Sequence, residues 1–367
     1  MFDFTQLTTL FFSPAGAAFI ISLLVTPLII KLAPVLKIID DPKIRRHPAI
    51  LHTKPTPRGG GIPLFLAIAA TSLIFLPQDG RLLAILLGGL VVVVVGFLDD
   101  KRDSSPYMRL VAQFLAAGIV VASGIGISFI SNPFGGIIDL SGFQINFSLL
   151  GAEHSLWIFS ALFGLAWIVA LMNAVSWSSG VDGQLSGFAA ISALVIAIFS
   201  LQYSADITQW PVTILAAITF GAFAGFLPWH AYPQKIMPGF GGATLAGYML
   251  AVLSILTTAK VGILLVVLAI PVVDAGYSIV RRLMSGKSPV WGDKKHLHHR
   301  LIAAGWSKQK VAVFYWISTM VLGVLALNLN ATHKFYTIVG ITLFVGALII
   351  CLNSWLQSSK PQDRASG

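Results

Sequence analysis

The sequence predicts an all-α, polytopic integral membrane protein with about eleven transmembrane helices. Composition carries the first part of this prediction. Hydrophobic residues make up 56% of the 367-residue chain and charged residues only 10%, and the mean hydropathy of +0.85 is far outside the range of a soluble domain of this length. The second observation is that uncharged runs, each long enough to cross a bilayer as a helix, recur along the whole chain.

The first predicted span covers 15–37. The N-terminal residues MFDFTQ lack the basic stretch that begins a secretory signal, so we expect this helix to be retained. We find no internal repeat and no soluble domain, which predicts one multi-span membrane domain over 1–357 and a short polar cytoplasmic tail over 358–367. The other predicted spans are 62–77, 82–98, 109–130, 157–175, 188–202, 209–229, 242–259, 261–280, 311–330 and 335–356.

The basic residues predict the orientation. Twenty of the 24 lysines and arginines fall on alternate connections or in the tail, and the opposite face holds only Arg81, Lys260 and Lys334. The positive-inside rule then places the N-terminus outside and the C-terminus in the cytoplasm. The net charge of +10 therefore suits anionic lipid or phosphate ligands, and we expect no nucleic acid because no basic domain stands clear of the membrane.

The predicted outer face carries one short stretch with strand-like alternation. Residues 137–149, IIDLSGFQINFSL, alternate around Ser141 and Gly142, a pair that suits a turn. This pattern predicts a short extracytoplasmic β-hairpin.

The polar, glycine-rich segments all fall on the predicted cytoplasmic face, so we expect this one surface to carry the chemistry. They are HTKPTPRGGG (52–61), DDKRD (99–103), NAVSWSSGVDGQLSG (173–187), PQKIMPGFGGA (233–243) and GKSPVWGDKKHLHHRL (286–301).

Asp99 and Asp100 stand at the end of a long uncharged run. One interpretation is a solvated helix end, although carboxylates at a helix C-terminus oppose the macrodipole. The other is a site for a divalent cation, because Mg²⁺ commonly takes one or two carboxylates together with substrate phosphate and water. The pair alone does not decide between these interpretations.

Two basic segments are candidates for phosphate binding. KPTPRGGG is either a Gly/Pro turn or a backbone cradle for a phosphate beside Lys54 and Arg58. His296, His298 and His299 are flanked by basic residues, which favours phosphate binding over a metal cluster. The alternative for the histidines is a basic amphipathic segment that rests on lipid headgroups.

Asp274 is an ionisable residue near the end of the predicted span 261–280. It either faces a cavity or pairs with Arg281 or Arg282. We expect the structural pairing.

The order of these motifs is more specific than any one of them. HTKPTPRGGGIPLF, GFLDDKRD, NAV…GVDG…SG, P-x-K-I…G…G and PVVD…RR…GKSP…HLHH follow one another along nearly the whole chain. In this order they resemble the polyprenyl-phosphate N-acetylhexosamine-1-phosphate transferase superfamily, glycosyltransferase family 4. The GKSP…HLHH ending is more similar to the undecaprenyl-phosphate N-acetylglucosaminyl 1-phosphate transferase branch than to the phospho-N-acetylmuramoyl-pentapeptide translocase.

The resemblance implies a reaction. A UDP-N-acetylhexosamine, such as UDP-N-acetylglucosamine, gives its sugar-1-phosphate to polyprenyl (undecaprenyl) phosphate and releases UMP. This is the first membrane step of cell-envelope polysaccharide synthesis, which includes lipopolysaccharide, at the cytoplasmic face of the bacterial inner membrane. The implied cofactor is Mg²⁺, with Mn²⁺ as a substitute, and a homodimer is compatible with the resemblance.

The resemblance also implies residue roles. Asp99 would deprotonate or orient the lipid phosphate, Asp100 would support the metal or that phosphate, and Asp182 would lie in the nucleotide and metal region. Asp99, Asp100 and Asp182 are thus the predicted catalytic residues, and Asp100 and Asp182 the predicted metal ligands. The predicted substrate-binding residues are Lys54, Arg58, Asn173, Lys235, His296, His298 and His299.

The chain departs from the family pattern at two motifs. The usual Asn-Ala-x-Asn-x-x-Asp-Gly-x-Asp-Gly-Leu has Ser176, Ser179 and Gln184 in place of the second Asn, the first Asp and the Leu. The usual Gly-Asp-x-Gly-Ser has Phe240 in place of the Asp that serves the family as principal metal ligand. Three hypotheses follow: an active transferase, a degenerate paralogue that binds polyprenyl phosphate or nucleotide-sugar without turnover, and a secondary transporter, for which the expected inverted repeats are lacking.

Overall fold

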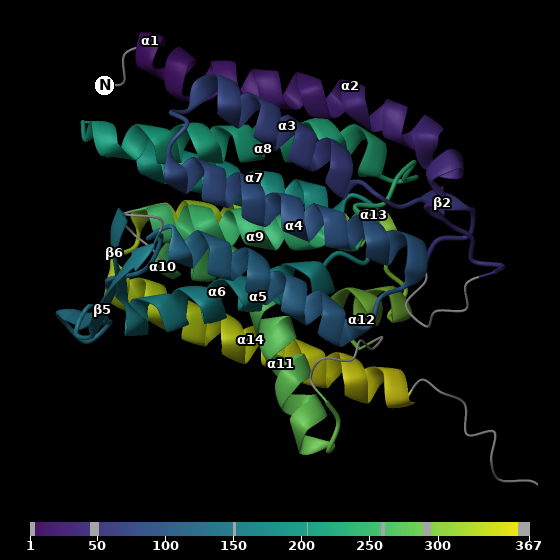
Figure 1. The fold of residues 1–367 in the computed structure, drawn as a ribbon. Helices are drawn as coiled ribbons and strands as arrows, with labels where there is room; N and C mark the ends of the chain where they lie inside the picture. Colours follow the sequence, from purple (N-terminus) through teal and green to yellow (C-terminus); the bar gives the residue numbers. More distant parts are fainter. Residues whose placement is uncertain are drawn as a thin grey trace, which may run out of the picture.

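The computed structural model of the chain describes residues 4–44, 51–149, 152–203, 205–257, 261–288 and 295–358. These residues are mostly helical, with three two-stranded sheets. Successive long helices run back and forth between the two ends of an elongated bundle (Figure 1). Loops and short elements therefore gather at the two ends.

The helices are α1 (Phe4–Leu7), the π-helix η1 (Thr8–Phe12), α2 (Ser13–Leu36), α3 (Gly61–Phe75), α4 (Gly80–Arg102), α5 (Pro106–Ala122), α6 (Ile158–Trp177), α7 (Gln184–Leu201), the 3₁₀-helix η2 (Ile207–Gln209), α8 (Trp210–His230), α9 (Gly239–Leu256), α10 (Val261–Val267), α11 (Ala269–Met284), α12 (Leu297–Ala303), α13 (Lys308–Asn328) and α14 (Ala331–Ser358). The strands are β1 (Ile39–Asp40), β2 (Thr56–Pro57), β3 (Phe129–Ser131), β4 (Ile137–Asp139), β5 (Gln144–Leu149) and β6 (Ala152–Trp157).

Each of the eleven predicted runs contains a helix, although the run 109–130 is helical only as far as Ala122 and ends in β3, and the count of eleven spans is not confirmed. In the described part of the chain, eight helices are long and apolar enough to cross a membrane. A ninth is added if α10 and α11, which meet at a bend of 84°, are one broken span. The helices α3 and α5 are apolar but shorter, with 15 and 17 residues.

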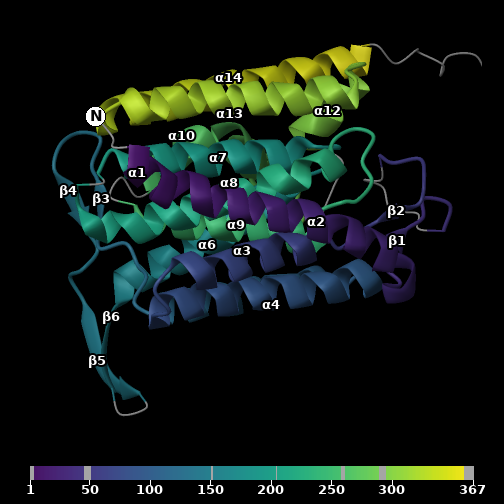
Figure 2. The ribbon, with the colours of Figure 1, turned by 90° about the horizontal axis from the view of Figure 1, so that it is seen from above.

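The helices α7 and α9 lie at the centre of the bundle, where almost every side chain is buried. The pair α13 and α14 covers one side, and α3 and α4 lie on the opposite side (Figure 2). Outer helices such as α2 and α14 expose large apolar side chains, for example Leu24, Val35, Leu343 and Phe344. Exposed apolar side chains in this number are expected where lipid is the solvent.

The predicted hairpin over 137–149 has the wrong strand pairing. Strand β4 pairs with β3 rather than with β5, and β5 pairs with β6. The backbone turns locally after β4, because the Asp139 carboxylate accepts hydrogen bonds from the Ser141 N–H and hydroxyl at 2.8 and 2.5 Å. The local turn made by the Asp139 side chain thus lies between β4 and β5, the two segments that the alternating pattern had predicted to pair with each other.

Glycines bring three helices close together beneath one end of the bundle. A Cβ atom built on Gly96 of α4 would lie 2.2 Å from the Gly241 Cα of α9, and one built on Gly61 of α3 would lie 2.7 Å from the Gly242 nitrogen. Only glycine permits such a close backbone approach. This contact sets the last turn of α4 directly against the first turn of α9.

Candidate functional site

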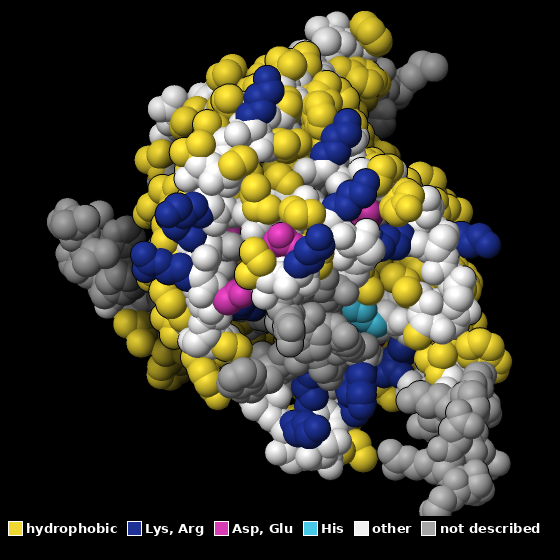
Figure 3. All heavy atoms as spheres, turned by 90° about the vertical axis from the view of Figure 1, so that its right-hand side faces the viewer, with side chains coloured by type: hydrophobic (Ala, Val, Ile, Leu, Met, Phe, Trp, Pro, Cys, Tyr) yellow, Lys and Arg dark blue, Asp and Glu magenta, His cyan; other side chains and the backbone are white. Residues whose placement is uncertain are grey.

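The predicted polar segments meet at the end of the bundle where α4 ends. The Gly60 N–H donates to the Met237 carbonyl at 3.0 Å, and the Gln234 N–H donates to the Asp182 carboxylate at 3.3 Å. The His298 ring lies against Gly180. Figure 3 views this end, where Lys and Arg side chains surround carboxylates and a histidine. The expectation that these segments share one surface is confirmed.

Asp99 is fully buried at the end of α4. Its Oδ1 accepts hydrogen bonds from the Arg109 Nε at 2.7 Å and from the Ser104 N–H at 3.0 Å. Its Oδ2 accepts no hydrogen bond from the described residues and lies 3.8 Å from the Arg58 Nη2. One oxygen of Asp99 is therefore held only by a long ion pair with Arg58.

Asp100 is also buried, and its side chain contacts Arg58 and the start of α9. Its Oδ1 forms an ion pair with the Arg58 Nε at 3.1 Å and accepts a hydrogen bond from the Phe240 N–H, also at 3.1 Å. Gly239 adopts a left-handed conformation with φ of 65° and lies so close that a Cβ there would be 2.1 Å from the Asp100 Oδ2. The solvated-helix-end interpretation of the Asp99–Asp100 pair is therefore wrong.

Arg58 is held in place by its own backbone, because its N–H donates to the Ile38 carbonyl at 2.7 Å next to the β1–β2 pair. Burial lowers the pKa of its guanidinium, but the carboxylates of Asp100, Asp40, Asp103 and Asp99 raise it by more, so the pKa lies above its usual value. Arg58 stays charged among these four carboxylates.

A cavity of about 290 Å³ opens beside Asp99. Its lining comes from every polar segment except 286–301, and it includes Arg58, Asp99, Arg109, Ser179, Gly180 and Phe240. The Arg109 guanidinium lies 5.1 Å from the centre of the Phe240 ring, which is a cation–π distance. Two arginines, Arg58 and Arg109, and two carboxylates, Asp99 and Asp40, thus line the same cavity.

Asp182 is buried on another side of this cavity, whose lining includes its neighbour Val181. Its carboxylate pairs with the Lys308 Nζ at 3.2 Å and accepts the Gln234 N–H. The predicted residues Lys54 and Lys235 are exposed and do not line the cavity.

The three histidines lie at the start of α12, with the His298 ring next to Gly180. The His296 Nδ1 bonds to the Asp274 Oδ2 at 2.9 Å, and the Asp274 Oδ1 accepts the Leu297 N–H at 2.9 Å. The predicted pairing of Asp274 with Arg281 or Arg282 is thus not confirmed, because the partner that the structure shows is His296. His299, half-buried, lies against His298 with ring centres 4.1 Å apart and the ring planes tilted by 41°.

His298 is buried, and neither of its ring nitrogens has a hydrogen-bond partner among the residues that the structure describes. Burial, with smaller contributions from His299 and His296, holds its pKa well below the usual value. His298 is therefore a neutral imidazole, which is able to donate to a ligand from one ring nitrogen.

The donor set does not fit a preformed Mg²⁺ site. No group of three or more His, Cys, Asp or Glu side chains that could hold a metal occurs among the described residues. Asp99 and Asp100 are paired with arginines, and Asp182 is paired with Lys308. At the position of the family's principal metal ligand, Phe240 offers a ring that cannot coordinate a hard cation.

A second, apolar cavity of about 440 Å³ lies between α5, α6 and α11. Its lining includes Leu110, which follows Arg109 in the chain, and Asn173, whose amide donates to the Gln113 side chain at 2.7 Å. Trp167, Trp177 and Val272 add apolar walls. The predicted residue Asn173 thus belongs to an apolar groove next to the polar cavity.

A family model, "Glycosyl transferase family 4", matches residues 82–258. The probable undecaprenyl-phosphate N-acetylglucosaminyl 1-phosphate transferase of Bacillus subtilis is 30% identical over 313 residues, which cover 82% of this chain and 81% of that protein. The chain belongs to glycosyl transferase family 4.

Other family 4 members show the same relationship. The decaprenyl-phosphate N-acetylglucosaminephosphotransferase of Mycolicibacterium smegmatis is 26% identical over 332 residues, 82% of this chain and 78% of that protein. The phospho-N-acetylmuramoyl-pentapeptide-transferase of Bacillus licheniformis is 30% identical over 325 residues, 85% of this chain and 95% of that protein, and is a weaker match overall. The branch predicted from the sequence is confirmed.

Sequence reasoning missed several residues of this family 4 site. Arg109, Asp40 and His52 line the polar cavity, and the His52 Nε2 lies 4.0 Å from the Asp40 Oδ1. Arg109 begins a predicted span, and its basic charge was counted only toward the orientation. A basic residue at the start of a predicted span, after a connection that begins with an acidic pair, was the available signal.

Proposed function

We propose that the protein transfers N-acetylhexosamine-1-phosphate from a UDP-sugar to polyprenyl phosphate. The relatives with N-acetylglucosamine-1-phosphate transferase names support this function, and they favour UDP-N-acetylglucosamine as the donor and undecaprenyl or decaprenyl phosphate as the acceptor. We further propose that the reaction takes place at the cytoplasmic face of a bacterial inner membrane, as the first membrane step of an envelope polysaccharide.

One observation carries the proposal: Asp99, whose Oδ2 accepts no hydrogen bond among the described residues, lines the same cavity as Arg58 and Arg109. A lipid phosphate and a diphosphate repel each other, and two fixed cations offset that repulsion. The apolar groove begins at Leu110, directly after Arg109, and its walls suit a polyprenyl chain. A polyprenyl phosphate with its phosphate at Arg109 would then place its polyprenyl chain in the apolar groove.

The chemistry follows from this placement. The Asp99 Oδ2 accepts a proton from the acceptor phosphate, whose oxygen attacks the sugar-bearing phosphorus of the UDP-sugar. The bond from that phosphorus to the bridging oxygen breaks, and UMP leaves with the bridging oxygen. Arg58, kept charged by its carboxylate neighbours, stabilises the charge that develops on the phosphoryl oxygens.

The requirement for Mg²⁺ or Mn²⁺ stays a prediction, as does a homodimer. The paired carboxylates give no ready metal site, which keeps a second function in view: a paralogue that binds polyprenyl phosphate or nucleotide-sugar without turnover. The packing of Arg109 between Asp99 and the Phe240 ring favours this second function, because the Asp99 carboxylate is already engaged by a cation of the chain.

One experiment separates the two functions. Purified protein is incubated with undecaprenyl phosphate, a panel of labelled UDP-sugars, and either Mg²⁺, Mn²⁺ or EDTA, and UMP and butanol-extractable sugar are measured. Transfer from one UDP-sugar supports the enzyme. Saturable binding of undecaprenyl phosphate or a UDP-sugar with no UMP release in any metal condition supports the binding paralogue, and absence of both binding and turnover contradicts the proposal.

A further inference from the structure

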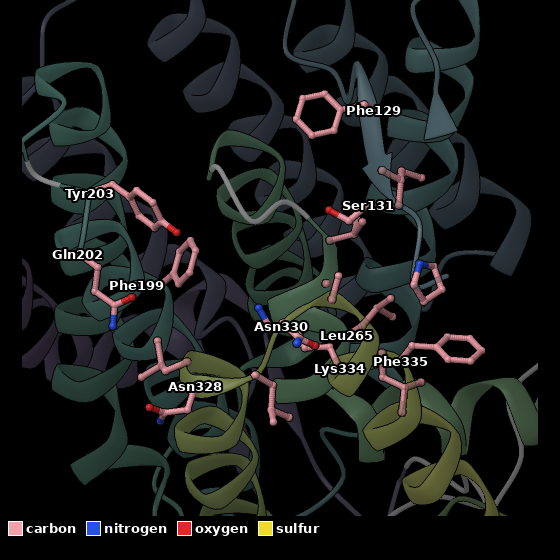
Figure 4. Close-up of a pocket in the computed structure, with 18 residues that line it drawn as sticks. Phe129, Ser131, Phe199, Gln202, Tyr203, Leu265, Asn328, Asn330, Lys334 and Phe335 are labelled. Atoms are coloured by element: carbon pink, nitrogen blue, oxygen red, sulfur yellow. The ribbon is translucent and has the colours of Figure 1, made fainter. Parts of the chain in front are cut away.

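A cavity of about 560 Å³ lies at the end of the bundle opposite Asp99. It is enclosed by β3, the ends of α7 and α13, and the starts of α10 and α14 (Figure 4). The transferase function proposed above gives this cavity no role, because it is separated from the polar cavity by the length of the bundle.

Lys334, in the first turn of α14, is half-buried in this cavity. Its Nζ lies 5.8 Å from the centre of the Phe199 ring, and no carboxylate of the described residues lies within ion-pair distance. A cation that is partly withdrawn from water is unfavourable without a counter-charge. A cation–π contact at this distance compensates only in part.

Neutral polar groups line the same cavity as this cation. The Asn330 Oδ1 accepts the His333 N–H at 2.9 Å, so its amide nitrogen keeps its donor capacity. Gln202 and the Tyr203 hydroxyl face the same cavity from the end of α7 (Figure 4). Ammonium, amide and hydroxyl donors around one space suit an acceptor-only anion such as a phosphate.

The position of the cavity indicates how a phosphate would arrive. The helices α7 and α13 end here, so the cavity lies where spanning helices leave the hydrocarbon. Its walls include Leu265, Leu327 and Ile338, which are apolar. The outer side of α14 continues this apolar surface with Val339 and Leu343, which are exposed.

We propose that this cavity binds the phosphate group of an anionic phospholipid, with Lys334 as the charged contact and the acyl chain along the apolar wall. The same donors would also accept inorganic phosphate, and the two sources are separated by experiment. Lipid is the favoured source because only an amphiphile uses both the Lys334 end and the apolar wall.

The test compares the wild-type chain with Lys334→Gln, Lys334→Arg and Lys101→Gln. Lys101 is an exposed lysine at the other end of the molecule, so its replacement matches the loss of charge without touching the cavity. Retained phosphatidylglycerol and phosphatidylcholine are counted by native mass spectrometry, and thermal unfolding is followed with added phosphatidylglycerol, phosphatidylcholine or inorganic phosphate.

We expect wild type and Lys101→Gln to prefer phosphatidylglycerol over phosphatidylcholine, and Lys334→Gln to bind phosphatidylglycerol about fivefold more weakly, as for the loss of one membrane-facing charge. Lys334→Arg should keep the preference. A Lys334-dependent effect of inorganic phosphate, without a lipid preference, would assign the phosphate to the soluble source and overturn the lipid. Equal phosphatidylglycerol binding by a well-folded Lys334→Gln protein would overturn the whole proposal. Neither result depends on turnover, so the transferase proposal is tested separately.

Discussion

Arg109 occupies an unusual position at the residue scale. It contacts the Asp99 carboxylate on one side and the Phe240 ring on the other. The Phe240 ring packs against the Arg109 guanidinium. A carboxylate at position 240 would instead attract this guanidinium as well as a metal. The departure from the family motif is therefore accompanied by a local arrangement that accommodates it.

Asp99 is predicted to be the residue on which turnover depends most. Asp99→Asn keeps the shape of the side chain but removes the proton acceptor at Oδ2, and we expect kcat to fall by about 10²- to 10⁴-fold. UMP release measures this effect, with Asp206→Asn, an exposed carboxylate at the other end of the bundle, as the control. Turnover within a few-fold of wild type would remove Asp99 from the proposed chemistry.

The altered metal motif gives a second prediction at this scale. Phe240→Asp with Ser179→Asp and Ala243→Ser should raise Mn²⁺ affinity by about tenfold or more over wild type, because carboxylates are the ligands that hard cations prefer. The matched control, Phe240→Asn with Ser179→Asn and Ala243→Ser, has the same shape without the charges. Mn²⁺ binding is measured by electron paramagnetic resonance, which does not require turnover, and equal affinity of the two variants would show that position 240 does not face a cation.

At the element scale, the site depends on how closely α4 approaches α9. Gly96 and Gly241 allow this approach, and the approach lets the Phe240 N–H reach Asp100 at 3.1 Å. The hydrogen bond between Asp274 of α11 and His296 at the start of α12 likewise holds α12 in position, and the His298 ring then lies against Gly180. Small residues and one buried carboxylate thus set the positions of whole helices.

We therefore expect Gly96→Ala to push α4 away from α9. The added methyl group should cost about 1–3 kcal/mol of the free energy of unfolding and should lower turnover as well. The thermal unfolding midpoint in detergent and UMP release measure the two effects.

Gly118→Ala is the matched control, because a Cβ at Gly118 in α5 meets nothing within 4 Å. This variant should be neutral or slightly stabilised, by up to about 1 kcal/mol, since alanine favours the helix. Equal behaviour of the two variants would contradict the role given to the contact between α4 and α9.

At the scale of the whole molecule, the two ends of the bundle differ in chemistry. One end carries the five polar segments and most of the basic residues, and the other carries the two hairpins β3–β4 and β5–β6. If the positive-inside rule holds, the first end faces the cytoplasm.

Cysteine labelling tests this orientation. With the exposed native Cys351 replaced by serine, a cysteine at the exposed position of Lys101 should react only with a reagent on the cytoplasmic side. A cysteine at the exposed position of Asp139 should react only from outside. Labelling of position 101 from outside would reverse the orientation, and with it the side on which the proposed donor is used.

The sequence by itself determined the class of the protein, its helices and its family. Hydropathy is a local property, so each predicted run was found where a helix lies, and the ordered motifs identified the family and named Asp99, Asp100 and Arg58. The number of spans was less secure, because hydropathy does not reveal the 84° bend between α10 and α11 or show whether the short helices α3 and α5 cross the membrane.

Only the tertiary structure decided the partners of these residues. Asp100 meets the backbone of Phe240 across 140 positions of the chain, and His296 meets Asp274 across 22. The strands β4 and β5 were both expected, yet each pairs with a different neighbour. An ion pair or a strand pair is set by which surfaces the packing brings within a few ångströms, and local pattern and composition carry no information about that distance.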